Sequence, residues 1–168
     1  MSRPDVWLRG SVEGVPPILQ PAAHALLQAL EDVETVVGDL RPDELWRKPG
    51  GAASPGFHLK HIAGATDRLF TYARGESLNE LQQTWRTAES NDGPSILSPT
   101  DLAGQVRATI ESALDQLRST PADTLLIPRT IGRAQLPTTV LGCLFHAAEH
   151  AARHAGQLVT TKKAIRGS

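Results

Sequence analysis

Four stretches of the chain carry apolar residues at intervals of three and four positions, the spacing that gathers side chains on one face of an α-helix. These stretches cover about residues 16–40, 54–74, 99–119 and 137–161. In the first stretch, the apolar positions are Leu19, Ala22, Leu26, Ala29, Leu30, Val33, Val37 and Leu40. The pattern predicts four amphipathic helices.

Two of these helices begin with a recognisable capping signal. Ser54 precedes Pro55, and a serine followed by proline is typical of an N-cap and the first helical position. Ser98 is likewise followed by Pro99, and Asp101 is well placed to favour the first turn of a helix. These signals predict where the second and third helices start.

The connections on either side of the third helix are long. Residues 75–97 form a polar stretch with room for one short helix, whereas residues 120–137 are rich in proline and β-branched residues, which favours a loop with a short extended pair. Tryptophans in terminal and connecting segments are expected to anchor them against the bundle: Trp7, Trp46 and Trp85. The sequence predicts one all-α domain, residues 1–168, with the architecture of a four-helix bundle and room for a crossover connection.

Composition narrows the class of protein. The 18 acidic and 17 basic residues nearly cancel, so no general field attracts the chain to nucleic acid or to an anionic membrane. A single cysteine, Cys143, excludes an internal disulfide framework and is typical of a reducing compartment. The sequence shows neither a signal-peptide pattern nor an apolar run of membrane-spanning length. We therefore expect a cytoplasmic protein.

Histidines are concentrated in two of the predicted helices. In "HAAEHAARH", His146, His150 and His154 are four residues apart, and four residues advance a helix by about 400°, so successive rings are offset by about 40°. His154 falls at the edge of the buried arc of this helix, His150 slightly further out, and His146 furthest toward solvent. An i, i+4 pair can hold one ion about 2.0–2.1 Å from each ring nitrogen. His150 and His154 are therefore the better pair of metal ligands.

A third ligand should come from a facing helix. The segment "FHLKHIAG" supplies two candidates, His58 and His61, and helix geometry alone leaves the choice between them open. His24 lies opposite the apolar stripe of the first helix and is set aside. Cys143 lies on the same stripe as the late histidines and is interpreted as a small hydrophobic residue rather than a ligand. The alternative to a metal site is a set of hydrogen-bonded histidines in a packed core.

The segments "FHLKHIAGATDRLF" and "FHAAEHAARHAGQL" resemble the DinB-like (DinB/YfiT) superfamily, whose members carry an H-[LI]-A element in the second helix and an H-x-x-x-H-x-G-Q element late in the chain. The matching positions are His61, Ile62, Ala63, His150, His154, Gly156 and Gln157. The resemblance implies a four-helix bundle that holds a divalent metal ion with His61, His150 and His154.

His58 and His146 are additional to this pattern. They are candidates for an alternative third ligand or for groups that orient the ligands from behind. Imidazole is compatible with zinc, nickel, iron and manganese, so the spacing does not select the metal.

The resemblance also implies a class of activity. Characterised relatives suggest a metal-dependent enzyme that acts on a small molecule, with low-molecular-weight-thiol S-transferase or hydrolase chemistry. The alternative is a non-catalytic metal-binding or stress-associated protein. The near-neutral charge argues against direct binding of nucleic acid, and a homodimer formed through exposed helix faces is plausible.

Overall fold

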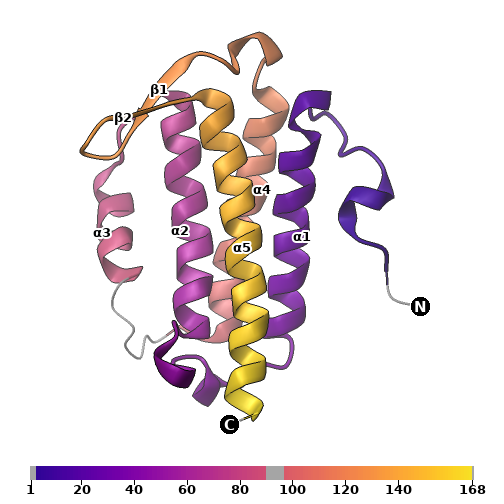
Figure 1. The fold of residues 1–168 in the computed structure, drawn as a ribbon, viewed down its shortest axis with the longest axis vertical. Helices are drawn as coiled ribbons and strands as arrows, with labels where there is room; N and C mark the ends of the chain where they lie inside the picture. The colour runs from indigo at the N-terminus through magenta and orange to yellow at the C-terminus, as the bar shows by residue number, and fades with distance from the viewer. Residues whose placement is uncertain (1–2, 90–96, 168) are drawn as a thin grey trace.

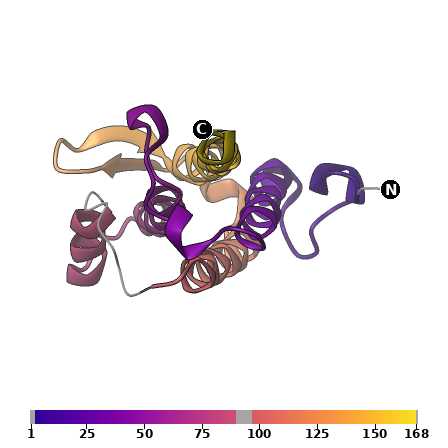
Figure 2. The ribbon, with the colours of Figure 1, turned by 90° about the horizontal axis from the view of Figure 1, so that it is seen from below.

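The computed structural model describes residues 3–89 and 97–167, and four long helices lie side by side in it (Figure 1). These are α1 (Gln20–Val37), α2 (Pro55–Arg74), α4 (Pro99–Ser119) and α5 (Val140–Gly167). Seen end-on in Figure 2, they occupy the four corners of a bundle in which α5 packs against α1 and α2, and α4 packs against the same two helices from the other side. The all-α bundle expected from the apolar periodicity is confirmed.

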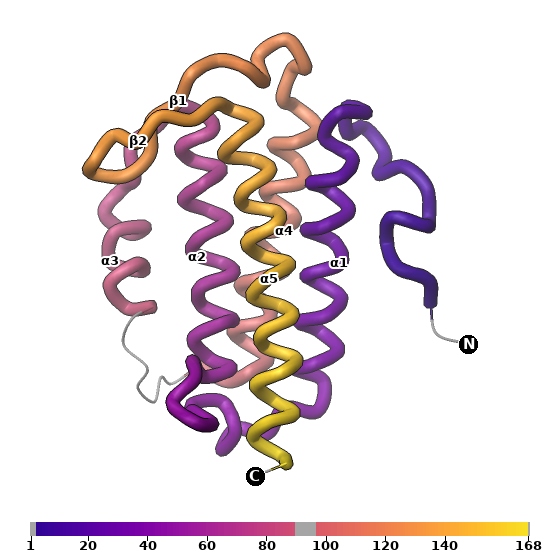
Figure 3. Tube along the Cα trace, viewed as in Figure 1, coloured from indigo at the N-terminus to yellow at the C-terminus, as the bar shows by residue number. Residues whose placement is uncertain are grey.

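The chain does not run simply up and down through the bundle. A short helix, α3 (Glu80–Glu89), follows α2 and carries the chain back along the outside of α2, so that α4 starts at the same end of the bundle as α2 (Figure 3). This confirms the predicted crossover and the predicted short helix within 75–97; residues 90–96 of that segment lie outside the described part of the chain.

The predicted capping signals are confirmed. The Ser54 side chain accepts a hydrogen bond from the backbone N–H of Phe57 at 3.1 Å. Ser98 and Asp101 form a reciprocal capping box, in which Ser98 Oγ accepts from the backbone of Asp101 and the Asp101 carboxylate accepts from the backbone of Ser98. Both caps supply partners for backbone N–H groups that have none within the helix.

The bounds of two helices differ from the prediction. Helix α1 begins at Gln20 rather than near residue 16, because Pro17–Leu19 form a 3-10 turn, η2. Helix α5 begins at Val140 rather than near residue 137, because Leu136–Thr139 is a strand, β2, that pairs antiparallel with β1 (Pro128–Ile131). This hairpin confirms the extended pair expected in residues 120–137. The helix α5 also continues past residue 161 to Gly167.

The core lies between the four long helices and is built from the predicted apolar stripes. Fully or almost fully buried side chains include Leu26, Val33, Leu59, Ile62, Val106, Ile110, Leu144 and Leu158. Cys143 is 1% exposed and belongs to this core, which agrees with its interpretation as a small hydrophobic residue. None of the described helices combines the length and the apolar character needed to cross a membrane.

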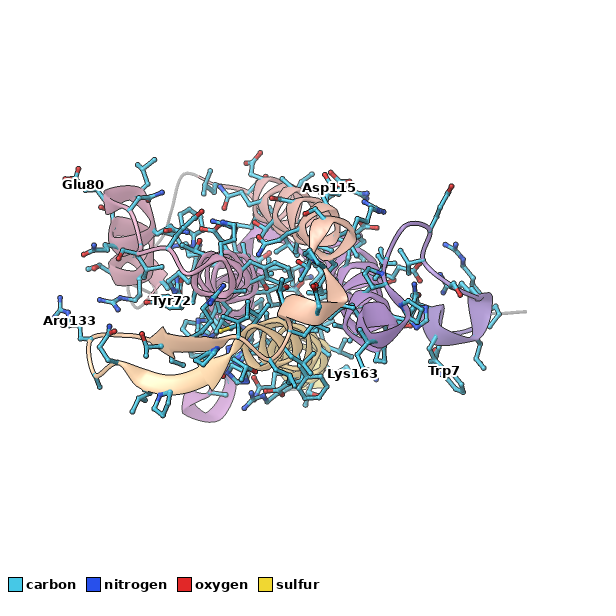
Figure 4. The ribbon with its side chains drawn as sticks, turned by 90° about the horizontal axis from the view of Figure 1, so that it is seen from above. Trp7, Tyr72, Glu80, Asp115, Arg133 and Lys163 are labelled. Carbon is cyan, nitrogen blue, oxygen red and sulfur yellow. The ribbon has the colours of Figure 1, made fainter. Side chains whose placement is uncertain are left out.

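Two of the three tryptophans anchor connecting segments as expected. Trp85 Nε1 donates to the backbone oxygen of Lys60 at 3.2 Å, and the Trp46 ring lies 4.7 Å from the Lys60 ammonium. For Trp7 the expectation is wrong: its side chain is 64% exposed at the periphery of the molecule (Figure 4). The neighbouring Val6 is buried instead, and its backbone N–H donates to Gln28.

The C-terminal end of α5 is tied to the loop after α1 by charged groups. Glu44, in the 3-10 turn η3 (Pro42–Glu44), has a fully buried side chain that accepts hydrogen bonds from Arg166 Nε at 2.9 Å and from the backbone N–H of Arg41. Lys162 and Arg166 both pair with Asp39. These bonds explain why α5 continues beyond the predicted end at residue 161.

Candidate metal centre

Three histidine rings converge where α2 packs against α5. His61 Nε2 lies 2.8 Å from His150 Nε2, and one nitrogen from each of His61, His150 and His154 falls within 4.8 Å of the others. The helices that carry them are neighbours in the bundle, and the i, i+4 spacing of His150 and His154 turns both rings toward α2. The structure thus brings together the three residues to which the family resemblance assigned the metal.

The two candidates on α2 take different places. His61 joins the converging group, whereas His58, 4% exposed, lies behind it with its Nδ1 3.1 Å from His154 Nδ1. A hydrogen bond at Nδ1 leaves the Nε2 atom of His154 available on the other side of the ring. His58 is therefore placed to orient His154, one of the two roles that the sequence left open.

His146 stands apart from the converging group, as its position on the helix predicts. Its side chain is 48% exposed, and Nδ1 lies 2.7 Å from a carboxylate oxygen of Glu149. A second set of donors, made by His146, Glu149 and His150, is close enough to hold an ion at the surface. It shares His150 with the inner group.

Burial keeps the His150 and His154 rings uncharged. Burial, reinforced by the neighbouring His61 ring, lowers the pKa of His150 to about 4 and that of His154 to about 3. Both rings are therefore neutral at neutral pH, and the neutral imidazole is the form that binds metal.

The donor set fits a divalent ion. Two nitrogens that each lie about 2.0–2.1 Å from an ion with tetrahedral geometry are about 3.3 Å apart. His61 Nε2 and His150 Nε2, at 2.8 Å, would separate by about 0.5 Å to reach this spacing. Rings on two helices can make such an adjustment through their side-chain torsions.

Two of the three candidate ligand rings, His61 and His150, have different neighbours on their outer nitrogens. His61 Nδ1 lies 2.9 Å from Oε2 of Glu89, which is 4% exposed and also binds the guanidinium of Arg68. His150 Nδ1 instead lies 3.0 Å from Nη2 of Arg153, a half-exposed side chain that also donates to Glu149.

Glu89 remains ionised despite its burial. Burial raises the pKa of Glu89, but the hydrogen bonds from His61 and Arg68 and the charge of Arg68 outweigh this effect, and the pKa falls below its ordinary value. Neither Glu89 nor Arg68 could be identified as a site residue from the sequence. Glu89 lies 28 residues from His61, in a polar segment with no local pattern that marks it as buried.

A groove opens beside the converging rings, between the C-terminal half of α5 and the segment that leads into α2. Its volume is about 590 Å³, and both His154 and His58 line it. The other lining residues are Ala52, Ala53, Phe57, Arg153, Gly156, Gln157, Thr160 and Thr161. A small molecule in this groove would lie next to one of the three candidate ligands.

Comparison with known proteins bears on the fold and the family of this chain. No curated protein gives a significant match. Among solved structures, a conserved protein from Enterococcus faecalis is similar over 90% of this chain and 98% of its own, with a TM-score of 0.67 and 19% identity, which shows a common fold. The model of the DinB superfamily matches residues 22–158, a span that includes all three converging histidines. The chain therefore belongs to the DinB superfamily.

Proposed function

We propose that this protein is a divalent-metal-dependent enzyme whose ligands are His61, His150 and His154. The observation that carries the proposal is the incomplete ligand set. Among the described residues, no fourth histidine, cysteine or carboxylate belongs to the converging group, and a site with three protein ligands keeps a coordination position for water or substrate.

The chemistry that the metal would supply is activation of a bound thiol or water by a lowered pKa, or polarisation of a substrate oxygen. The protein's own contribution is to present three imidazoles, of which His150 and His154 are kept neutral by burial, and a groove that His154 lines. Gln157 and Thr160 line that groove and can hydrogen-bond a substrate. Zinc, nickel, iron and manganese all suit three imidazole donors.

A low-molecular-weight thiol is the substrate class we propose first, with hydrolysis by a bound water as the second reaction. The support for the thiol is the resemblance to the family's S-transferases together with a groove large enough for a small molecule. Conjugation of a test electrophile by the metal-loaded protein across a panel of thiols is the direct assay. No binding and no conjugation with any thiol would overturn the transferase proposal.

The alternative function is metal binding without catalysis. A fourth protein ligand seen in the metal-loaded protein would support it, whereas a bound water would support an enzyme. Unfolding of the His150→Ala variant would also favour a structural ion.

The first experiment measures metal content by elemental mass spectrometry on protein purified without a chelator or a histidine tag. We expect about one equivalent of a divalent metal in the parent protein and little in the His150→Ala, His154→Ala double variant, because removal of two of three donors abolishes a site of this kind. His24→Ala is the matched control, because His24 bonds only the backbone oxygen of Gly10 in the described structure. A parent protein that takes up no metal after titration with divalent ions would overturn the proposal.

A further inference from the structure

The short helix α3 brings a buried carboxylate to the back of a candidate metal ligand. Glu89 is the last residue of α3, and its Oε2 atom lies 2.9 Å from His61 Nδ1. The opposite ring nitrogen, His61 Nε2, faces His150. The His61 ring therefore lies between the carboxylate and the converging nitrogens, the arrangement in which a second group orients a ligand.

Arg68 completes this arrangement by holding the carboxylate itself. Its two terminal nitrogens donate to the two oxygens of Glu89, Nη1 to Oε1 and Nη2 to Oε2 at 3.1 Å. An ionised carboxylate that is bound by both terminal nitrogens of an arginine can only accept hydrogen bonds. His61 consequently donates from Nδ1 and keeps the lone pair on Nε2, the atom that faces the other rings.

The surface of α2 is shaped to receive α3 at this point. A methyl group on Gly64 would lie 1.9 Å from Glu89 Oε1 and 2.5 Å from the Trp85 ring, so only glycine allows this approach. About two turns before Glu89 on α3, the amide of Gln82 donates to Thr71 and to Asp67 at 2.7 Å. Three separate contacts along α3 therefore place Glu89 against His61.

We propose that Glu89 is a positioning residue for the metal centre: it fixes the tautomer and orientation of the His61 ring, and α3 is the element that delivers it. The proposal rests on the proposed function, because it takes His61 as a ligand. Outer partners of this kind typically change metal affinity by about 10- to 100-fold. Helix α3 then has a role in the site as well as in the connection between α2 and α4.

The test compares the zinc affinity of Glu89→Gln with that of the parent protein, by competition with a chromophoric chelator. We expect the variant to bind zinc about 10- to 100-fold more weakly, and the visible absorption of its Co²⁺-loaded form to shift because the His61 ring is released. Glu80→Gln is the matched control on the same helix, since Glu80 is exposed and points away from α2 (Figure 4). An unchanged affinity and an unchanged spectrum in Glu89→Gln would overturn the proposal.

A double-mutant cycle separates an effect through His61 from a general structural effect. In a His61→Ala background, Glu89→Gln should lower zinc affinity no further, because the ring on which Glu89 acts is gone. An equal loss in both backgrounds would overturn the proposal. If His61→Ala alone leaves zinc affinity unchanged, the ligand set of the proposed function fails; if it lowers the affinity and Glu89→Gln does not, only the present proposal fails.

A second variant covers the case in which Glu89→Gln does not fold, which circular dichroism of the metal-free protein reveals. Glu89→Asp keeps the charge that Arg68 requires but shortens the side chain by one methylene, which withdraws the carboxylate from His61. We expect weaker zinc binding with a retained fold. A folded Glu89→Asp protein with the parent's affinity and Co²⁺ spectrum would overturn the proposal.

Discussion

Two buried glutamates, Glu89 and Glu44, show the same physical solution applied in two regions of the molecule. Their side chains are 4% and 0% exposed, and each is held by an arginine, Arg68 in one case and Arg166 in the other. A buried carboxylate needs such partners, because removal from water is unfavourable unless its charge is compensated by hydrogen bonds.

The remaining partner of each carboxylate differs. Glu44 also contacts the loop after α1, where it accepts a hydrogen bond from the backbone N–H of Arg41. Glu89 binds an imidazole whose opposite nitrogen faces two further histidines. One glutamate therefore stabilises the join between a loop and the end of α5, while the other is connected to the candidate metal centre. Variants at the two places should separate stability from metal affinity.

The largest change in metal affinity outside the ligands and Glu89 is expected from Gly64→Ala. The added methyl group forces α3 away from α2, which moves Glu89 from His61, so zinc affinity should fall at least about 10-fold. Overpacking costs about 1–3 kcal/mol and the better helix propensity of alanine returns part of it, so we expect a net loss of about 1–2 kcal/mol in the free energy of unfolding.

Gly104→Ala is the matched control for this change. A methyl group at Gly104, on the exposed face of α4, meets nothing within 4 Å. Its free energy of unfolding should rise by about 0.5–1 kcal/mol, with unchanged zinc affinity. If Gly64→Ala behaves in the same way as this control, in denaturant unfolding and in zinc competition, the close packing of α3 does not matter to the site.

A smaller effect, an increase in zinc affinity, is expected from Arg153→Gln. An arginine can only donate, so Arg153 makes His150 Nδ1 an acceptor and places the ring proton on Nε2, the nitrogen that faces His61. Its charge also opposes a nearby cation, by roughly 1 kcal/mol in a water-like environment. Removal of both effects should strengthen zinc binding about fivefold, as measured by chelator competition.

Arg133→Gln, at the tip of the hairpin (Figure 4), is the control for a simple change in net charge. It should leave zinc affinity within about twofold of the parent value, because a distant exposed charge is screened. Weaker zinc binding by Arg153→Gln would instead mean that Arg153 supports the site rather than opposing a bound cation.

The smallest effect on zinc affinity, and a clear effect on stability, is expected from Glu44→Gln. Hydrogen bonds from Arg166 and the Arg41 backbone lower the pKa of Glu44 from 4.5 to about 2. A carboxyl whose pKa is lowered by folding stabilises the protein fully above its unfolded pKa and loses this contribution as the pH falls through the folded pKa. Denaturant unfolding of metal-free protein should therefore show the variant less stable at neutral pH.

The difference between the parent and Glu44→Gln should narrow as the pH falls from about 4.5 toward 2, where the parent carboxyl also becomes neutral. A difference that stays constant over that range would contradict the assigned partners of Glu44. Zinc affinity at neutral pH should agree with that of the parent within about twofold, since Glu44 contacts none of the converging histidines.

The parts of the fold that the sequence predicted are those specified by neighbours along the chain. Apolar periodicity and the serine caps located α2 and α4, and the proline-rich segment located the hairpin. The start of α5 was predicted too early, because residues 137–139 pair with β1, a contact that no helical pattern reveals. Trp7 shows another limit: a large apolar side chain does not by itself indicate burial, and Trp7 is exposed whereas the neighbouring Val6 is buried.

In the candidate site, too, local spacing could be predicted from the sequence, whereas contacts between distant helices could not. The spacing of His150 and His154 could be read directly as a pair, but the choice between His58 and His61 depends on how α2 is rotated against α5. The family resemblance, not the spacing, assigned His61, and the structure places that ring in the converging group. Glu89 could not be identified from the sequence, because it is buried only where α3 packs closely against α2 at Gly64.

A metal ion held between α2 and α5, as proposed above, would have a thermodynamic consequence. His61 and His150 are 89 residues apart in the chain, so an ion bound between them links distant segments in the folded state and finds no equivalent site in the unfolded one. Such an ion stabilises the fold by about 4 kcal/mol when its free concentration is 1,000 times the dissociation constant. The persistence of the folded protein in a cell would then follow the supply of the metal, and protein deprived of it would be the first to be lost to proteolysis.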